Sequence, residues 1–340
     1  MEVETTLGLR ARLEVHGLGI AVEGDWPEVV EQVRLDFAWF ARPVESVPSA
    51  DVEVRVERRP PDFEALGNGV ASFVTPRNVV YQEGERTIVD YFGRAVSILD
   101  RSTGRLVVQG EDEHLVHEAV YHFLLSRIGE HLEARGLTRL HALGLTGGQG
   151  AVAVMLPSGG GKSTLALRAL RADGVRLLSE DSPLIDRRGN AHPFPLRIAV
   201  NPTDAAALPE GAVRRMDRME FHPKLVLDLE AFSDRVESQP QPLRHLVIGR
   251  RSLGTDASLE PVPRRSAVST LVREAIVGVG IYQGMEFVLQ KGMRDVAGKL
   301  GVAATRTAWC SGVLARAKVW RLTVGRDHAR NWDALAPLLD

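Results

Sequence analysis

Residues 151–167 read AVAVMLPSGGGKSTLAL: an apolar run, a glycine-rich turn and a segment with helical spacing. The apolar run predicts a buried strand, and the glycines after it let backbone N–H groups approach phosphate oxygens closely. Gly161-Lys162-Ser163 ends the turn as a Walker A sequence does, with a lysine for the terminal phosphates and a serine hydroxyl for Mg²⁺. The stretch therefore predicts a phosphate loop that binds a nucleotide. Its candidate binding residues are Ser158, Gly159, Gly160, Gly161, Lys162, Ser163 and Thr164.

The match to the Walker A pattern is imperfect, because the strict pattern has glycine where this chain has Leu156. A glycine-rich turn without a ligand is the alternative interpretation. It does not explain why Lys162 is the first lysine in a chain whose 42 basic residues are almost all arginine. Lysine and arginine are not interchangeable at a tight phosphate site. We therefore favour nucleotide binding, and we expect the Lys162 side chain to be exposed before a nucleotide binds.

Three further residues are candidates for catalysis. Glu180 and Asp181 close the next predicted strand, VRLLSED at 175–181, and working residues of α/β sheets lie at the carboxyl ends of strands. A carboxylate there could hold Mg²⁺, with Ser163 and Asp181 as the metal candidates, or accept a proton from a hydroxyl; a solvated acidic turn is the alternative. His141 lies on the predicted strand before the loop, where it could polarise a carboxylate, contact a phosphate or be structural.

The pattern of elements predicts two domains, 1–136 and 137–340. The second opens with the strand, loop, helix and strand rhythm of an α/β nucleotide-binding core. The first reads as a smaller α+β domain, a possible platform for a peptide. Its expected elements are strands within 10–22 and 50–59, a helix over 26–40, an antiparallel meander over 78–110 and an amphipathic helix over 111–136. Beyond residue 200 we expect strands at 224–229, 244–251 and 319–325 and helices at 266–277 and 303–317.

Composition narrows the functional classes. The chain has 340 residues with 42 Lys+Arg and 44 Asp+Glu, so its net charge of −2 gives no strong field for nucleic acid or an anionic membrane, and we expect neither as a partner. The single cysteine, Cys310, excludes an internal disulfide framework. No apolar run of about 18 residues and no signal-peptide pattern are present, which predicts a soluble, cytoplasmic protein. A homo-oligomer stays open.

Taken together, LHALGLT, LPSGGGKSTLALRAL, GVRLLSEDSPLID and HPFPLRI resemble the catalytic domain of HPr kinase/phosphorylase. The chain resembles more closely the HPr-kinase-like kinases of peptide natural-product clusters, including the lasso-peptide kinases. The resemblance covers residues 137–200 and continues weakly to the C-terminus. It implies an α/β P-loop core that uses ATP and Mg²⁺. In that family an upstream histidine, the phosphate loop and an acidic pair form the site, and the matching residues are His141, 158–163, Glu180 and Asp181.

Two departures from that family bear on the reaction. Its bifunctional members have an acidic residue directly after the loop serine, where this chain has Thr164. They also carry a downstream loop resembling EVRGLG, whereas the similar string EVHGLG lies far upstream here, at 14–19. The resemblance thus implies a kinase without the reverse phosphorylase reaction. The family's usual Asp-Asp is Glu-Asp here, so the identity of the base stays open, with Asp181 slightly favoured.

Weaker candidates for binding phosphate or substrate are basic residues after the acidic strand. Lys224 begins a predicted strand in a chain with few lysines, although a surface lysine is the commoner case. Arg214 and Arg215 could hold a phosphate or an acidic peptide, or form a solvated face, and Arg197 is a comparable case.

Three functions remain in competition. The first is an ATP-dependent kinase that phosphorylates a serine on a peptide or small protein, such as the last residue of a lasso-peptide precursor. The second is a small-molecule kinase on the same core, and the third is a nucleotide-gated binding module without transfer. A GTPase is disfavoured because the chain has no NKxD string, and a transporter ATPase because no LSGGQ signature follows the loop. The acidic pair favours transfer chemistry.

Overall fold

The computed structural model describes residues 9–46, 50–157, 159–206, 208–217, 223–277, 287 and 293–340. The chain divides into two compact units. The first comprises Met1–His131, Arg215–Lys224 and Gln283–Asp295, and the second Leu132–Arg214, Leu225–Tyr282 and Val296–Asp340. The sequence pattern suggested one cut at 136 and gave no sign that two later segments group with the first unit.

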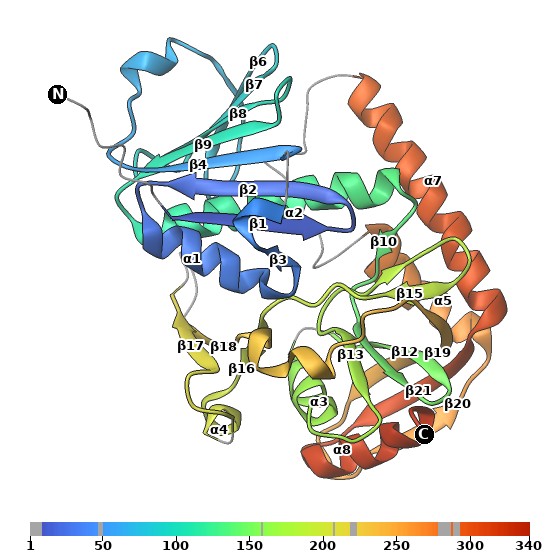
Figure 1. The fold of residues 1–340 in the computed structure, drawn as a ribbon. Coiled ribbons are helices and arrows are strands. Elements are labelled where there is room, and N and C mark those ends of the chain that lie inside the picture. The colour runs from blue at the N-terminus through green and yellow to red at the C-terminus, as the bar shows by residue number, and fades with distance from the viewer. Residues whose placement is uncertain are drawn as a thin grey trace. The chain divides into compact units, whose positions relative to one another are not determined.

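The first unit has a nine-stranded sheet in its described part, in the order β3-β1-β2-β4-β9-β8-β7-β6-β5 (Figure 1). The antiparallel meander expected over 78–110 is confirmed as β6 to β9. Helices α1 and α2 are joined by a buried contact of 2.8 Å between Asp36 Oδ2 and His117 Nε2. The elements are β1 (Arg10–Val15), β2 (Leu18–Gly24), α1 (Pro27–Asp36), β3 (Ala41–Arg42), β4 (Val52–Arg58), β5 (Ala71–Val74), β6 (Val79–Glu83), β7 (Arg86–Asp90), β8 (Ala95–Asp100), β9 (Arg105–Gly110) and α2 (Glu113–Ala134).

The second unit is built on a mixed sheet in the order β10-β14-β15-β19-β12-β11-β13, with β21 and β20 continuing from β19. A smaller sheet has the order β16-β18-β17. The elements that lie wholly or in part in this unit are β10 (Thr138–Arg139), β11 (Leu143–Gly147), β12 (Gly150–Met155), α3 (Lys162–Ala169), β13 (Arg176–Ser179), β14 (Leu184–Ile185), β15 (Asn190–His192), β16 (Ile198–Val200), α4 (Pro202–Ala205), β17 (Val213–Met216), β18 (Lys224–Leu227), β19 (Gln241–Arg251), β20 (Ser258–Pro261), α5 (Val268–Leu271), a π-helical turn (Val272–Val277), α7 (Met293–Arg316), β21 (Lys318–Val324) and α8 (His328–Leu335).

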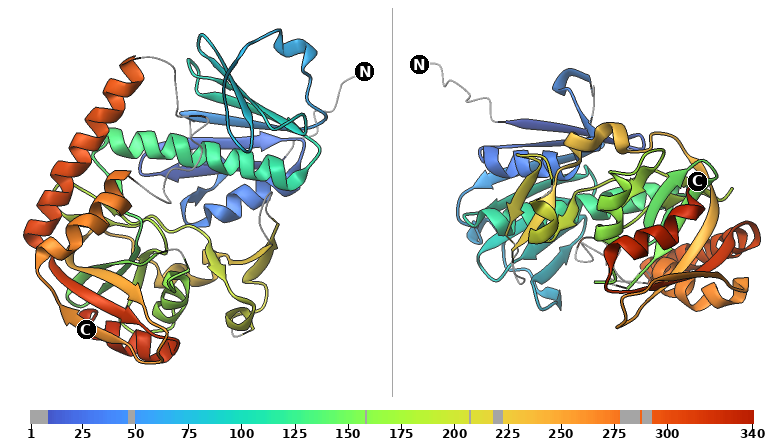
Figure 2. Two further views of the ribbon diagram at one scale, coloured as in Figure 1. Left: turned by 180° about the vertical axis from the view of Figure 1, so that it is seen from behind. Right: turned by 90° about the horizontal axis from the view of Figure 1, so that it is seen from below.

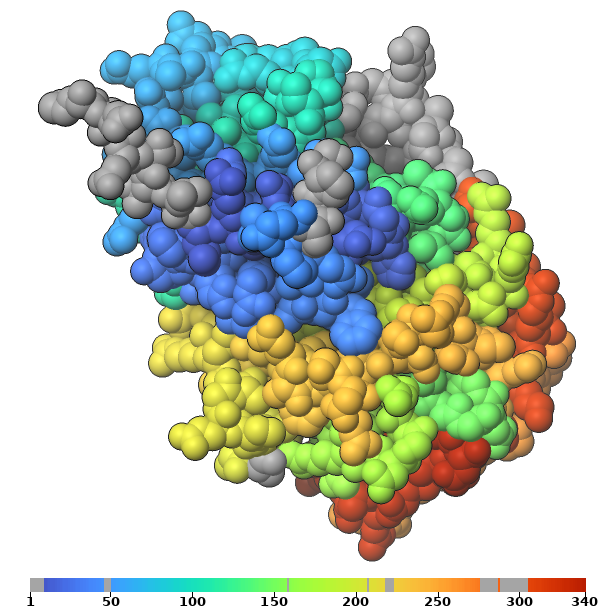
Figure 3. Space-filling model, in the orientation of Figure 1, coloured from blue at the N-terminus to red at the C-terminus, as the bar shows by residue number. Residues whose placement is uncertain are grey.

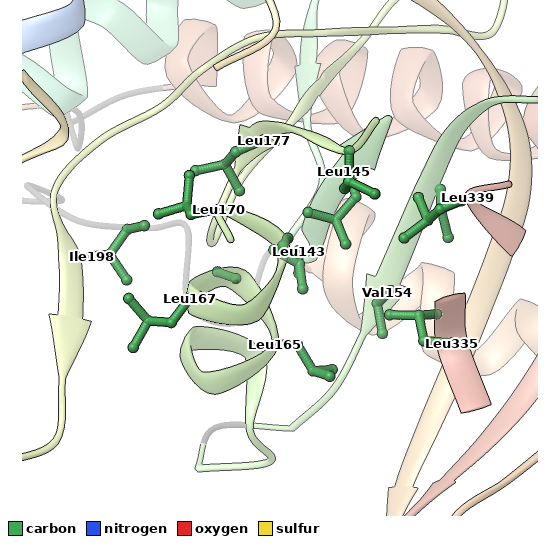
Figure 4. Close-up of a cluster of buried hydrophobic side chains, with 14 of the residues drawn as sticks. Leu143, Leu145, Val154, Leu165, Leu167, Leu170, Leu177, Ile198, Leu335 and Leu339 are labelled. Atoms are coloured by element: carbon green, nitrogen blue, oxygen red, sulfur yellow. The ribbon is translucent and has the colours of Figure 1, made fainter. Parts of the chain in front are cut away.

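Strand β12 is apolar throughout because both faces of its sheet are buried. Val152 and Val154 belong to the core on the side of α3 and α8, whereas Ala151, Ala153 and Met155 belong to the core on the side of α5 and α7. Such two-sided burial produces a continuous apolar run rather than alternation. Helices α3 and α8 lie side by side (Figures 1 and 2), and Figure 4 shows leucines of both helices in one core with side chains of β11 and β13.

Within the described part of the chain, no helix combines the length and the apolar character needed to cross a membrane.

Candidate functional site

The residues predicted to be catalytic come together at one edge of the sheet in the second unit. Strand β11 is antiparallel to both β12 and β13, so β12 and β13 run in the same direction. The glycine-rich loop follows β12, and Glu180 and Asp181 follow β13. His141 comes just before β11, in the link after β10 rather than on a strand as expected. Because β11 is reversed, a residue that precedes it reaches the same edge as residues that follow its neighbours.

Two glycines of the loop have a backbone conformation that residues other than glycine rarely adopt. Gly159 and Gly161 have φ of 70° and 101°, and a Cβ at either would meet nothing within 4 Å. The Gly160 N–H donates to the Pro157 carbonyl at 2.8 Å, and α3 begins directly after Gly161. Free N–H groups at such a helix start suit an anion. Ser158, also predicted to bind, lies outside the described residues.

Leu156, which replaces the glycine of the strict pattern, has a packing role. Its side chain is buried in the core beneath the loop. On the neighbouring strand β19, a Cβ at Gly249 would lie only 2.2 Å from Leu156 Cδ2. The leucine therefore fills space that Gly249 leaves free, and its carbonyl oxygen still accepts a hydrogen bond of 3.1 Å from Lys162 Nζ.

This packing predicts that Gly249→Ala destabilises the protein by about 1–3 kcal/mol, since the added methyl group must displace Leu156. Leu156→Ala alone should cost about 2–5 kcal/mol because it leaves a cavity. In the double variant the new methyl group enters that cavity, so the combined cost should be less than the sum of the two. Urea unfolding of all four proteins measures this coupling; strictly additive costs would contradict it.

Lys162 is only 7% exposed, which shows that the expectation of an exposed side chain was wrong. Its Nζ donates to the Leu156 carbonyl and to His141 Nε2 at 3.0 Å, and lies 3.6 Å from Asp181 Oδ1. Two hydrogen-bond acceptors and a nearby carboxylate thus compensate the ammonium for its loss of water. The lysine is held in place at the foot of the loop before any ligand binds.

His141 contacts both Lys162 and Asp181. Because the ammonium donates to Nε2, that nitrogen must carry a lone pair, which assigns the imidazole proton to Nδ1. Nδ1 lies 3.3 Å from Asp181 Oδ1, although it is not aligned for a hydrogen bond here. Burial alone would raise the pKa of Asp181, but the contact with His141 and the charge of Lys162 outweigh it and hold that pKa below its usual value. Asp181 is therefore ionised at neutral pH, and its side chain is 44% exposed.

Glu180 has a different environment from its neighbour. The Ser163 hydroxyl donates a hydrogen bond of 2.6 Å to Glu180 Oε1. Burial, together with the negative charge of Asp181, raises the pKa of Glu180 to about 7, against the opposing effect of the Ser163 hydrogen bond. The structure thus pairs Ser163 with Glu180, whereas Asp181, the predicted partner of Ser163 in binding metal, lies against His141 and Lys162.

The raised pKa of Glu180 predicts how stability depends on pH. Its folded pKa lies above the usual 4.5, so the ionised form is disfavoured in the fold. The resulting cost is absent below about pH 4.5, develops up to about pH 7 and is complete above it. Glu180→Gln should therefore stabilise the metal-free protein by up to about 3 kcal/mol at pH 8, with little effect near pH 4.5. Urea unfolding in EDTA at both pH values tests this, and an equal change at both would contradict it.

The remaining candidates lie on helix α3 or in and around the small sheet. Thr164 is half-buried on the first turn of α3. Arg214 donates to the carboxylate of the buried Asp228 at 2.9 Å, and Arg215 is exposed and donates to Asp217 at 3.0 Å. Lys224 is exposed and Arg197 half-buried. Arg197, Arg214 and Lys224 flank or belong to the small sheet β16-β18-β17, and Figure 3 shows the surface of this segment in yellow.

Arg251 is a candidate that the sequence pattern did not reveal. Its Nη1 donates a hydrogen bond of 2.7 Å to the carbonyl oxygen of Gly159, in the middle of the loop. The residue ends β19, which runs parallel to β12. The string RHLVIGRR predicted the strand, but only its pairing with β12 brings its last residue to the loop.

Comparison with known proteins adds no assignment: no protein-family model and no curated protein matches the chain. The resemblance to HPr-kinase-like kinases consequently rests on the motif residues alone.

Proposed function

We propose that the protein is an HPr-kinase-like kinase that transfers the γ-phosphate of ATP to a serine hydroxyl of a peptide. The observation that carries this proposal is that the two residues of the acidic pair contact different partners. Glu180 accepts the hydrogen bond of Ser163, while Asp181 contacts His141 and Lys162 and stays ionised. A module that only binds nucleotide needs the loop, a lysine and a metal ligand, but no second ionised carboxylate beside them.

The chain offers a suitable set of groups for Mg·ATP. The loop N–H groups and Lys162 match the charge of the terminal phosphates. The Ser163 hydroxyl and the Glu180 carboxylate are hard oxygen donors close enough together to serve one Mg²⁺. When bound, Mg²⁺ supplies positive charge that offsets the negative charge of the phosphates during transfer. We therefore assign Glu180, with Ser163, to the metal.

Asp181 is then the general base. Its partly exposed carboxylate can accept a hydrogen bond from the acceptor hydroxyl. In the transfer, the hydroxyl oxygen forms a bond to the γ-phosphorus, the bond from that phosphorus to the β–γ bridging oxygen breaks, and ADP leaves. The hydroxyl proton passes to Asp181. His141 and Lys162 hold the carboxylate in place and keep it ionised until that moment.

The resemblance to kinases of peptide natural-product clusters is what favours a peptide acceptor, with the C-terminal serine of a lasso-peptide precursor as the leading candidate. An unstructured chain end enters a cleft more easily than a serine in a packed domain. The smaller α+β unit fits the role of a peptide platform, although such units serve many purposes.

The experiment is incubation of the protein with Mg·ATP and a panel of acceptors, followed by mass spectrometry. The panel pairs serine-terminated peptides with the same peptides ending in alanine, and adds sugars and other small alcohols. We expect one phosphate on the serine-terminated peptides alone. If a metabolite gains phosphate while every peptide stays unmodified, the protein is a small-molecule kinase. If no acceptor gains phosphate, the nucleotide-gated binding module is favoured.

A further inference from the structure

The phosphate loop has two sides along the edge of the sheet. In the strand order, β11 and β13 lie on one side of β12, and β19 and β21 lie on the other. His141, Glu180 and Asp181 all belong to the first side. A nucleotide is linear, with its α-phosphate and nucleoside at the end opposite the γ-phosphate. If the γ-phosphate faces the acidic pair, the α-phosphate extends toward β19 and β21.

Arg251 lies on that second side, beside the loop, where its Nη1 contacts Gly159. Met155, the last residue of β12, pairs with Ile248, so β19 continues for three residues past the end of β12. The Arg251 side chain is exposed, and it has no carboxylate partner among the described residues. Its hydrogen bond to Gly159 uses one of five guanidinium N–H groups. Several donors therefore remain beside the loop for another acceptor.

A small hollow next to Arg251 limits what that acceptor can be. It has a volume of about 20 Å³, and Gly160, Gly161, Thr164 and His328 also line it. None of the described side chains that line it is acidic. A space of this size holds about one oxygen-sized group and excludes a nucleobase. An anionic oxygen beside a guanidinium and the N–H groups of the loop fits both the size and the charge.

We propose that Arg251 binds the α-phosphate of the nucleotide, and that one oxygen of this phosphate enters the hollow between the loop and α8. The proposal rests on the proposed function, because it takes the γ-phosphate to face the acidic pair. Arg251 would therefore contact nucleoside di- and triphosphates alike, and the nucleobase would lie outside the hollow. Arg251 is then a binding residue for the part of the nucleotide that does not react.

Calorimetry of Arg251→Ala with three probes tests this assignment: Mg·ATP, Mg·ADP and Mg·pyrophosphate. We expect the affinities for ATP and ADP to fall by the same factor, about 10- to 100-fold for a lost charge-assisted contact. The affinity for pyrophosphate should hold, because its two phosphates occupy the loop and Lys162 without a third. In kinetics the loss should fall on KM for ATP rather than on kcat. Arg250→Ala is the matched control, since Arg250 instead contacts Thr323.

Each other outcome overturns the assignment. Equal losses for ADP and pyrophosphate would mean that Arg251 only holds the loop through Gly159. A loss of affinity for ATP without a loss for ADP would mean that Arg251 contacts the γ-phosphate. Unchanged affinities for all three probes would mean that Arg251 does not contact the nucleotide. If the wild-type protein binds none of the three probes, the proposed function itself fails. Arg251→Lys, which keeps the charge but not the planar fork, should recover part of the affinity.

Discussion

Replacing Asp181 with asparagine should slow phosphate transfer by ~10²–10⁴-fold in a single turnover, the usual contribution of a general base. The side chain keeps its size and can still contact Lys162, but it can no longer take the proton of the acceptor hydroxyl. Binding of Mg·ATP should change little, because Glu180 and Ser163, and not Asp181, are the proposed ligands of the metal. Rapid-quench kinetics at saturating ATP, with calorimetry of the same variant, separates the two effects.

The matched control is Asp173→Asn, which removes a fully exposed carboxylate in the turn between α3 and β13. It should leave both quantities unchanged. Glu180→Gln should show the converse of Asp181→Asn, with weaker Mg²⁺-dependent nucleotide binding. A near-normal transfer rate in Asp181→Asn, with a large loss of transfer rate in Glu180→Gln alone, would contradict the assignment. Glu180 would then be the general base and Asp181 the metal ligand.

Replacing Lys162 with methionine should weaken Mg·ATP binding by about 10- to 100-fold and reduce transfer further. In the proposed complex the ammonium offsets the charge of the terminal phosphates, and in the structure it contacts His141 and Asp181. Methionine suits this experiment better than alanine because Lys162 is buried and a side chain of similar volume limits the cavity. Calorimetric titration with Mg·ATP measures the loss.

The control for this variant is Lys318→Met, at the exposed amino end of β21, away from the edge that carries the loop. Thermal unfolding of both variants checks that the fold persists. If Lys162→Met bound Mg·ATP as tightly as the wild-type protein, the loop would not be a phosphate loop and the proposed function would lose its basis.

Local sequence patterns predicted most elements of the fold, and the misses have physical causes. The stretch 10–22 forms a hairpin whose turn contains His16 and Gly17 at positive φ, which the alternation alone did not mark. Helix α7 begins at Met293 rather than near 303. Its first part contains Gly298 and Gly301, residues of low helix propensity. The segment 266–277 continues from α5 into a π-helical turn, which apolar spacing cannot distinguish from an α-helix.

The candidate site was predictable where neighbouring residues define it, and less so where side-chain direction does. Motif order alone brought His141, the loop and the acidic pair together. It could not show that Glu180 and Asp181 take different partners, because that depends on where two adjacent side chains point. The burial of Lys162 was missed because its acceptors, the Leu156 carbonyl and His141, come from the surrounding fold.

The most direct measurement of the central claim is the fate of the γ-phosphate, followed by ³¹P NMR with Mg·ATP and a serine-terminated peptide. We expect a phosphate ester on the acceptor to form in the same amount as ADP, and Asp181→Asn to slow the formation of both together. ADP balanced entirely by inorganic phosphate would contradict it, because the site would then hydrolyse ATP instead of transferring phosphate. ATP that stays intact with every acceptor tested would contradict it as well.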